Sequence, residues 1–112
     1  MPPEEPALYR VDTMAEAEAD LEAIAFRITL DYDAETALEY VRRLREEILG
    51  LDLFPQRGTR QLQGPPEVRS VPSHDRRYLI NFTIDEVEKV VTVYYVSGGG
   101  KLPRLDRLPK GG

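Results

Sequence analysis

The chain has 112 residues, of which 41% are hydrophobic and 31% are charged, a balance typical of one globular domain. It contains no cysteine and one histidine, which excludes a disulfide framework and a thiolate zinc site and argues against an imidazole-rich metal centre. No apolar run approaches the roughly 18 residues that span a bilayer, and the N-terminus is acidic and proline-rich, unlike a signal peptide. We therefore expect a soluble, cytoplasmic protein without a metal, cofactor or membrane partner.

The formal net charge of −5 is unevenly distributed along the chain. Residues 1–56 carry 5 basic and 14 acidic side chains, a net charge of −9, whereas residues 57–112 carry 10 basic and 6 acidic side chains, a net charge of +4. This asymmetry indicates either a partner surface on the basic half or simply acid-rich helices. Because phosphate contacts dominate nucleic-acid affinity, direct nucleic-acid binding is not expected of an acidic chain.

The first half of the chain begins with a short strand and a helix. Residues 7–12 alternate between apolar and polar side chains, which predicts the strand. Thr13 and Glu16 then fit a capping box, so the helix is expected to begin there and to run to about Leu30. Its apolar stripe consists of Ala17, Leu21, Ile24 and Ile28, and Ala25 widens it.

A second helix follows a break at residues 31–33. Asp33 can cap its N-terminus, and Gly50 is expected to end it. Its apolar stripe consists of Ala37, Val41, Leu44 and Ile48, supported by Leu38 and Leu51. Two amphipathic helices with a short connection predict a helical hairpin.

The second half of the chain predicts strands. Residues 77–84 and 89–96 are the richest runs of β-branched and aromatic side chains, and their short polar connection indicates an antiparallel hairpin. Residues 67–72 predict a further strand beside it. The order is therefore β-α-α-β-β-β, an α+β domain with a helical hairpin packed on a small, mainly antiparallel sheet. The side chains expected to face the helices are Tyr78, Ile80, Phe82 and Ile84.

The folded domain is expected to span residues 7–97. Residues 1–6 form a flexible lead-in, and residues 98–112 form a flexible basic tail that starts with a glycine run and contains two prolines. Such a tail can become ordered on a partner.

Three stretches resemble the RelE/ParE superfamily of bacterial toxins. Residues 15–24 resemble its first helix. Residues 51–58 resemble its junction after the second helix. In that junction a leucine is followed by two further residues, then by Phe-Pro and then by a glycine. Residues 68–71 followed by 77–80 are similar to its next two strands. Together the similar stretches span residues 8–97, and the predicted element order is that of the family.

The resemblance implies the toxin of a bacterial type II toxin–antitoxin pair, with a cognate antitoxin (ParD-like or similar) as partner. RelE-like members cleave messenger RNA in the ribosomal A site, whereas ParE-like members bind DNA gyrase and block it. The junction and the strand at 77–80 are more similar to the ParE branch. The net charge of −5 also disfavours entry into the phosphate-dense ribosome. We therefore expect a gyrase inhibitor that acts by protein binding. A ribosome-dependent endoribonuclease and a non-toxic binding module are the alternatives.

The nuclease alternative requires specific side chains. Cleavage of RNA without a metal needs an activated 2′-hydroxyl, cations at the phosphate and a proton for the leaving oxygen. Arg69, His74, Arg77 and Lys101 are the candidates, and His74 is the only one that titrates near neutral pH. Beyond the last strand, residues 97–100 are Ser-Gly-Gly-Gly in place of the family's arginine- or histidine-containing segment, which disfavours nuclease activity.

The side chains that could bind a protein partner overlap with the candidates for the nuclease. Guanidinium groups bind carboxylates bidentately, and tyrosines can either pack in the core or stack on a partner. We expect the antitoxin to lay an amphipathic helix and an extended segment over an apolar groove and the basic sheet edge. The candidate partner-binding residues are Arg69, Arg76, Arg77, Tyr94, Lys101 and Arg104.

Overall fold

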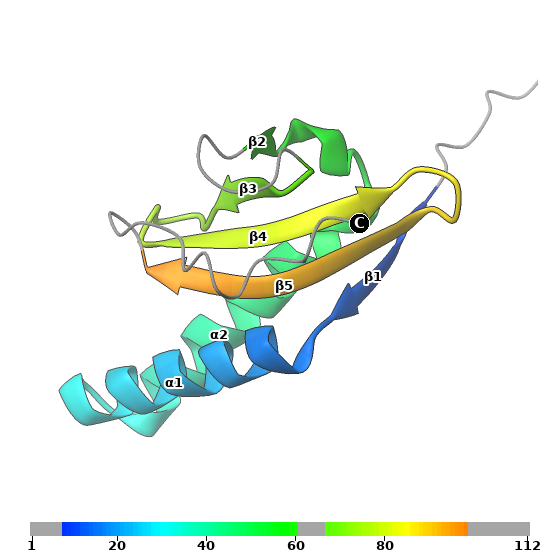
Figure 1. The fold of residues 1–112 in the computed structure, drawn as a ribbon. Coiled ribbons are helices and arrows are strands. Elements are labelled where there is room, and N and C mark those ends of the chain that lie inside the picture. Colours follow the sequence, from blue (N-terminus) through cyan, green and yellow to red (C-terminus); the bar gives the residue numbers. More distant parts are fainter. Residues whose placement is uncertain (1–7, 61–66, 99–112) are drawn as a thin grey trace, which may run out of the picture.

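The computed structural model describes residues 8–60 and 67–98. The predicted lead-in and nearly all of the predicted tail, including Lys101 and Arg104, lie outside the described residues. Two short 3₁₀ turns, at Gly50–Asp52 and Pro55–Arg57, follow the second helix. The helices and strands are β1 (Arg10–Thr13), α1 (Ala15–Asp31), α2 (Ala34–Leu49), β2 (Thr59–Arg60), β3 (Arg69–Pro72), β4 (Tyr78–Asp85) and β5 (Val90–Gly98) (Figure 1).

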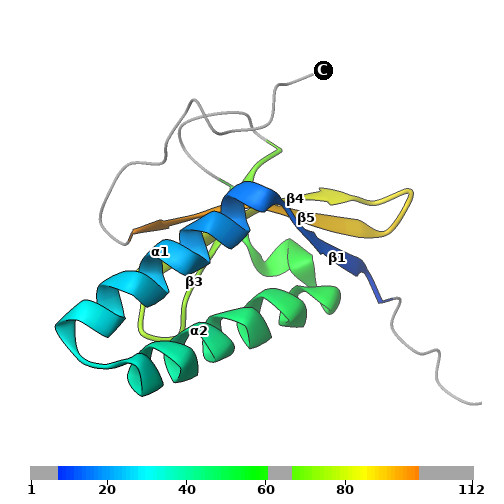
Figure 2. The same cartoon turned by 90° about the horizontal axis from the view of Figure 1, so that it is seen from below.

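The strands form one five-stranded sheet in the order β1-β5-β4-β3-β2. Only β1 and β5 run parallel, and the other pairs are antiparallel. Both helices lie on one face of this sheet (Figures 1 and 2). The predicted α+β fold, a helical hairpin on a mainly antiparallel sheet, is therefore confirmed. Strand β2 was not predicted, because two residues are too short to show a period. Within the described residues, no helix is long and apolar enough to cross a bilayer.

The core lies between the helical hairpin and the sheet, and it contains most of the predicted stripes. Leu38 is the exception, because 73% of its surface is exposed. It lies on the outer side of α2, beyond the reach of the sheet, and so the prediction that it supports the buried stripe is wrong. The fully buried side chains of the core include Leu21, Leu44, Leu51, Ile80, Phe82, Val91 and Val93.

The capping of the two helices differs from one to the other. Thr13 is the last residue of β1, and the N-cap of α1 is Met14, which makes no side-chain capping bond. The Met14 N–H instead donates to the Val93 carbonyl at 2.9 Å, so strand pairing extends through the position where the capping box was expected. That prediction is wrong. Asp33 does cap α2, because its carboxylate accepts from the Thr36 N–H at 2.7 Å, which lowers the pKa of Asp33.

The junction after α2 is held by tight packing and by arginine side chains. Pro55 is fully buried. Gly58 lies against the Phe82 ring, because a Cβ built on Gly58 would come within 2.6 Å of Phe82 Cζ. The Arg57 guanidinium donates to the Leu53 carbonyl at 2.6 Å, and the Arg69 guanidinium donates to the Gly58 carbonyl at 2.8 Å. The junction motif is therefore a packing element that fastens the second helix to the sheet.

A β-bulge interrupts the pairing of β4 with β5. Asn81 lies opposite Tyr95, whereas the next residue of β4 lies opposite Val93, so Tyr94 is the extra residue. Beyond the bulge, the Val96 N–H donates to a carboxylate oxygen of Asp20 in α1 at 2.8 Å. The bulge is thus tied to the helical layer, and Tyr94 is half-buried within it.

Candidate partner-binding site

An apolar groove runs between α1 and α2. Its hollow has a volume of about 470 Å³. Two of the residues that line it are alanines, Ala25 and Ala37, whose short side chains leave the groove open. Arg45 lies on the rim and forms an ion pair with Glu18 at 2.8 Å, which links the helices. The groove is lined by Leu21, Glu22, Ala25, Ala37, Leu38, Val41, Arg42 and Arg45.

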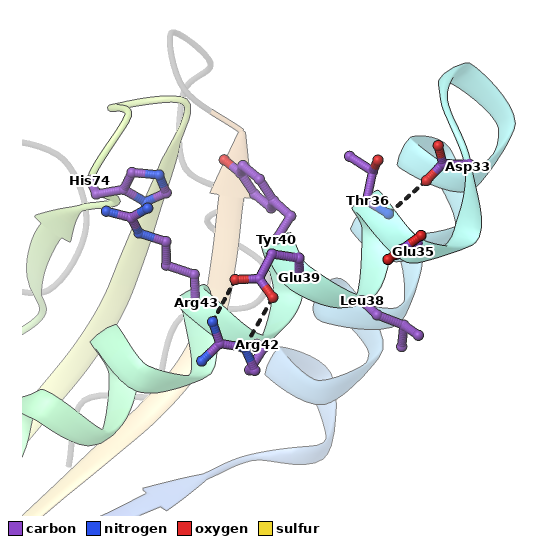
Figure 3. Close-up of a pocket in the computed structure, with 9 residues that line it drawn as sticks. All are labelled: Asp33, Glu35, Thr36, Leu38, Glu39, Tyr40, Arg42, Arg43 and His74. Carbon is purple, nitrogen blue, oxygen red and sulfur yellow. Dashed lines mark hydrogen bonds and ion pairs between the residues drawn. The ribbon is translucent and has the colours of Figure 1, made fainter.

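A second hollow, of about 590 Å³, lies beside α2 and the turn between β3 and β4. Tyr40 and Arg43 of α2 and His74 of the turn line one end, and the first turn of α2 lines the other (Figure 3). Leu38 and Arg42 line both hollows. Leu38 and Tyr40 point to opposite sides of α2, as expected for helical residues two positions apart. Leu38 and Arg42 therefore form a ridge between the hollows.

Asp75 ties the β3–β4 turn to α2. Its carboxylate accepts from the Tyr40 hydroxyl at 2.6 Å, from the Ser73 hydroxyl at 2.7 Å and from the Arg77 N–H at 3.1 Å. Burial raises the pKa of Asp75, but these hydrogen bonds outweigh burial and lower it to about 2. Burial and the bond to Asp75 raise the pKa of Tyr40. The turn is consequently held in a fixed position beside the helix at neutral pH.

The Tyr40→Phe substitution tests this tie. Because it removes a hydrogen bond to a charged carboxylate, we expect the free energy of unfolding at pH 7 to fall by about 1–2 kcal/mol. The folded-state pKa of Asp75 is depressed to about 2, so its contribution is present above its unfolded pKa of about 4 and is lost as the pH falls towards 2. Urea unfolding of both proteins from pH 7 to pH 2 should show the difference shrinking below about pH 4. A difference that is independent of pH would contradict the assignment.

His74 is held against α2 by Glu47. One oxygen of that carboxylate, Oε1, accepts from the His74 backbone N–H at 2.8 Å and lies 3.1 Å from Nδ1 of the ring. Because a carboxylate only accepts, Nδ1 carries the hydrogen in this contact, which leaves Nε2 for other partners. The ring also lies beside Tyr40, with centroids 6.0 Å apart. His74 is therefore an oriented side chain and not a freely moving one.

The structure brings only some of the predicted site residues together. His74, Arg76 and Arg77 share the exposed β3–β4 turn. Arg69 lies opposite Phe82, four residues along β4 from the start of that strand, so roughly 13 Å of strand separates it from the turn. Its guanidinium is also committed to the junction after α2. Tyr94 lies in the bulge of β5, apart from both.

Sequence reasoning missed Arg43 as a site residue and had assigned Ala25 and Leu38 to the core. The spacing of Arg43 from Glu39 and Glu47 favours ion pairs within α2. In the structure Glu39 pairs with Arg42, and Glu47 accepts from His74. Arg43 consequently forms no ion pair within 4 Å among the described residues, although, besides the bond from Arg42, its charge helps to lower the pKa of Glu39.

Comparison with known proteins identifies the family. Residues 11–102 match the family model described as the ParE toxin of the type II toxin–antitoxin system parDE. No curated protein matches the chain. Because the family model spans most of the chain, this protein belongs to the ParE toxin family and is a type II toxin of the wider RelE/ParE superfamily.

Solved structures share the fold. The chromosomal ParDE system of P. aeruginosa matches with a TM-score of 0.72 and 19% identity, covering 83% of this chain and 98% of that one. The RelBE2 toxin–antitoxin complex of Mycobacterium tuberculosis matches with a TM-score of 0.64 and 19% identity over 88% and 100% of the two chains. A mutant of the E. coli toxin RelE in the free state, in which two arginines are replaced by alanine, matches with a TM-score of 0.56 and 14% identity. This match covers 81% of this chain and 83% of that one.

Proposed function

We propose that this toxin inhibits DNA gyrase by binding it, without cleaving RNA, and that a cognate antitoxin neutralises it. The observation that carries the proposal is the match of residues 11–102 to the ParE toxin family. The arrangement of side chains supports a binding mechanism over a nuclease. Arg69 lies roughly 13 Å of strand away from the turn that bears His74 and Arg77, and cations that stabilise one phosphate must surround that phosphate.

The antitoxin is proposed to place an amphipathic helix in the α1–α2 groove. The groove supplies an apolar floor with alanines and charged rims of both signs, formed by Glu22 on one side and by Arg42 and Arg45 on the other. A helix with apolar residues at spacings of three and four, flanked by charged residues, matches this surface. The RelBE2 complex of M. tuberculosis, which has the same fold, was solved as a toxin–antitoxin complex, and this supports an antitoxin as the occupant.

Supercoiling by purified gyrase tests the proposed function. We expect the toxin, freed of antitoxin, to block supercoiling at a near-stoichiometric ratio. The polypeptide encoded by a small reading frame beside the toxin gene should restore supercoiling. In parallel, primer extension on ribosome-bound messenger RNA should show no new cleavage.

The other outcomes distinguish the alternatives. Active gyrase together with cleaved messenger RNA would contradict the proposal and indicate a RelE-like nuclease. In that event Arg77→Ala should abolish cleavage while the fold survives, whereas Arg69→Ala would also remove the bond to the Gly58 carbonyl that holds the junction. Active gyrase together with intact messenger RNA would indicate a non-toxic binding module.

A further inference from the structure

We propose that the hollow between α2 and the β3–β4 turn is a carboxylate-recognition site for an acidic segment of the toxin's protein target, with Arg43 as its principal contact. The inference rests on the proposed function, because it names the surface by which the toxin would engage that target. It concerns the hollow of Figure 3 and not the apolar groove on the other side of α2.

The three arginines near the middle of α2 are used differently. Arg42 bonds to Glu39 and Glu46, and Arg45 bonds to Glu18. Arg43 has no such ion pair in residues 8–60 or 67–98, and its side chain extends toward the His74 ring (Figure 3). An exposed guanidinium that extends toward an oriented imidazole offers N–H donors that can bind a carboxylate bidentately.

The carboxylates near the turn contact other groups to different extents. Glu47 accepts two contacts from His74 through Oε1, while its buried Oε2 has no hydrogen-bond partner among the described residues, and Asp75 accepts from Tyr40 and Ser73. Glu39 pairs with Arg42, which lowers the pKa of Glu39, and the charge of Arg43 also helps to lower that pKa. Two further arginines extend the positive surface along the turn. Arg76 is exposed at a backbone φ of 63°, and the side chain of Arg77 is 72% exposed with its Nε 3.7 Å from Asp75. Three exposed arginines, Arg43, Arg76 and Arg77, therefore lie at this end of the hollow or along the turn beside it.

The other end of the hollow carries the opposite charge, which favours a peptide over a nucleic acid. Asp33 and Glu35 line the hollow at the first turn of α2, opposite the end that holds Arg43. A phosphate backbone has negative charge at every step, so it would meet these carboxylates as it followed the hollow. A peptide segment can place an acidic residue at Arg43, an apolar residue over Tyr40, and a non-acidic residue at the acidic end.

The ridge formed by Leu38 and Arg42 suggests how an antitoxin in the groove would block target binding in the hollow. Leu38 and Arg42 line both the hollow and the α1–α2 groove. A helix seated in the groove contacts this ridge, and a target segment that fills the hollow borders the same two side chains. The two partners therefore compete, so that neutralisation needs no change in the fold of the toxin.

The test compares two charge reversals, Arg43→Glu and Arg27→Glu. Arg27 is an exposed residue of α1 that lines neither hollow. The first measurement is gyrase inhibition by the whole toxin. The second is an NMR titration of the labelled toxin with the N-acetylated, C-amidated pentapeptide Glu-Glu-Leu-Ser-Ser, or with a single-stranded oligothymidine of about ten nucleotides, a length within the range bound by single-strand-binding domains.

We expect Arg43→Glu to raise the half-inhibitory concentration by about tenfold or more, because it places like charges at the interface. Arg27→Glu should change it by less than about twofold. The peptide should shift the signals of Arg43 and His74 in the wild type but not in Arg43→Glu. Equal inhibition by all three proteins, equal loss in both variants, absence of peptide shifts, or preferential shifts with the oligothymidine would each overturn the proposed site. If the wild type does not inhibit gyrase but the peptide still binds at Arg43, the gyrase assignment fails and the site stands.

Discussion

Replacing Ala25 by arginine is expected to weaken antitoxin binding about 100-fold, since an arginine in a close helix–helix contact costs both shape complementarity and the desolvation of a charge. Ala25 is half-buried and lines the α1–α2 groove together with Ala37. An arginine at this position would occupy the space proposed for the antitoxin helix. The fold should survive, because arginine is a good helix former and the outer side of Ala25 faces solvent. The toxin should therefore remain active while it escapes neutralisation.

The matched control is Ala23→Arg. Ala23 is an exposed residue of the same helix and lines neither hollow, so its replacement adds the same charge and the same side chain outside the groove. Calorimetric titration of each toxin with the polypeptide encoded beside its gene measures the difference in affinity. An affinity of Ala25→Arg equal to that of Ala23→Arg would show that the antitoxin helix does not occupy the groove.

The Gly58→Ala substitution is expected to lower the free energy of unfolding by about 1–3 kcal/mol through overpacking. The new Cβ would lie 2.6 Å from Phe82 Cζ and 3.2 Å from Arg69 Cβ. Phe82 is fully buried and cannot turn aside. The backbone at Gly58 has a φ of −65°, which alanine adopts readily, so the cost is purely steric. The melting temperature should fall by roughly 5–15 °C.

Gly50→Ala provides the contrast. The φ of Gly50 is −64°, and nothing lies within 4 Å of a Cβ built there. Alanine restricts the unfolded chain at such a site, so we expect a gain of about 0.4–1 kcal/mol. Thermal unfolding followed by circular dichroism measures both variants. A Gly58→Ala protein as stable as the wild type would show that the junction is not packed against β4 as described.

Much of the fold was predictable because the strongest signals are local. The spacing of Leu21, Ile24, Leu44 and Ile48 placed the buried faces of both helices, and the β-branched runs placed the hairpin. The N-cap at Asp33 was predictable for the same reason, since its bond reaches only three residues ahead. The order of the elements, together with the junction motif, was sufficient to indicate the family.

The candidate site was less predictable because it depends on tertiary contacts. Helical periodicity shows that Ala25 and Leu38 border the buried stripe, but it does not show that Ala25 is half-buried while Leu38 is exposed. The capping box failed because pairing with β5 continues through Met14. From the sequence, Arg69 was a candidate to bind a phosphate or a partner. In the structure its guanidinium instead donates to the Gly58 carbonyl. Arg43 and His74 line the same hollow because α2 packs beside the β3–β4 turn, a tertiary contact that no sequence spacing encodes.

The most direct test of a toxin that acts by protein binding is a capture experiment with immobilised gyrase. Gyrase should retain the free toxin at close to one toxin per binding site, and it should not retain toxin that has been mixed with its antitoxin. The Arg43→Glu protein should be retained poorly, and the Arg27→Glu protein should be retained like the wild type. Failure of gyrase to retain the free toxin, or equal retention of the toxin–antitoxin complex, would contradict this mechanism.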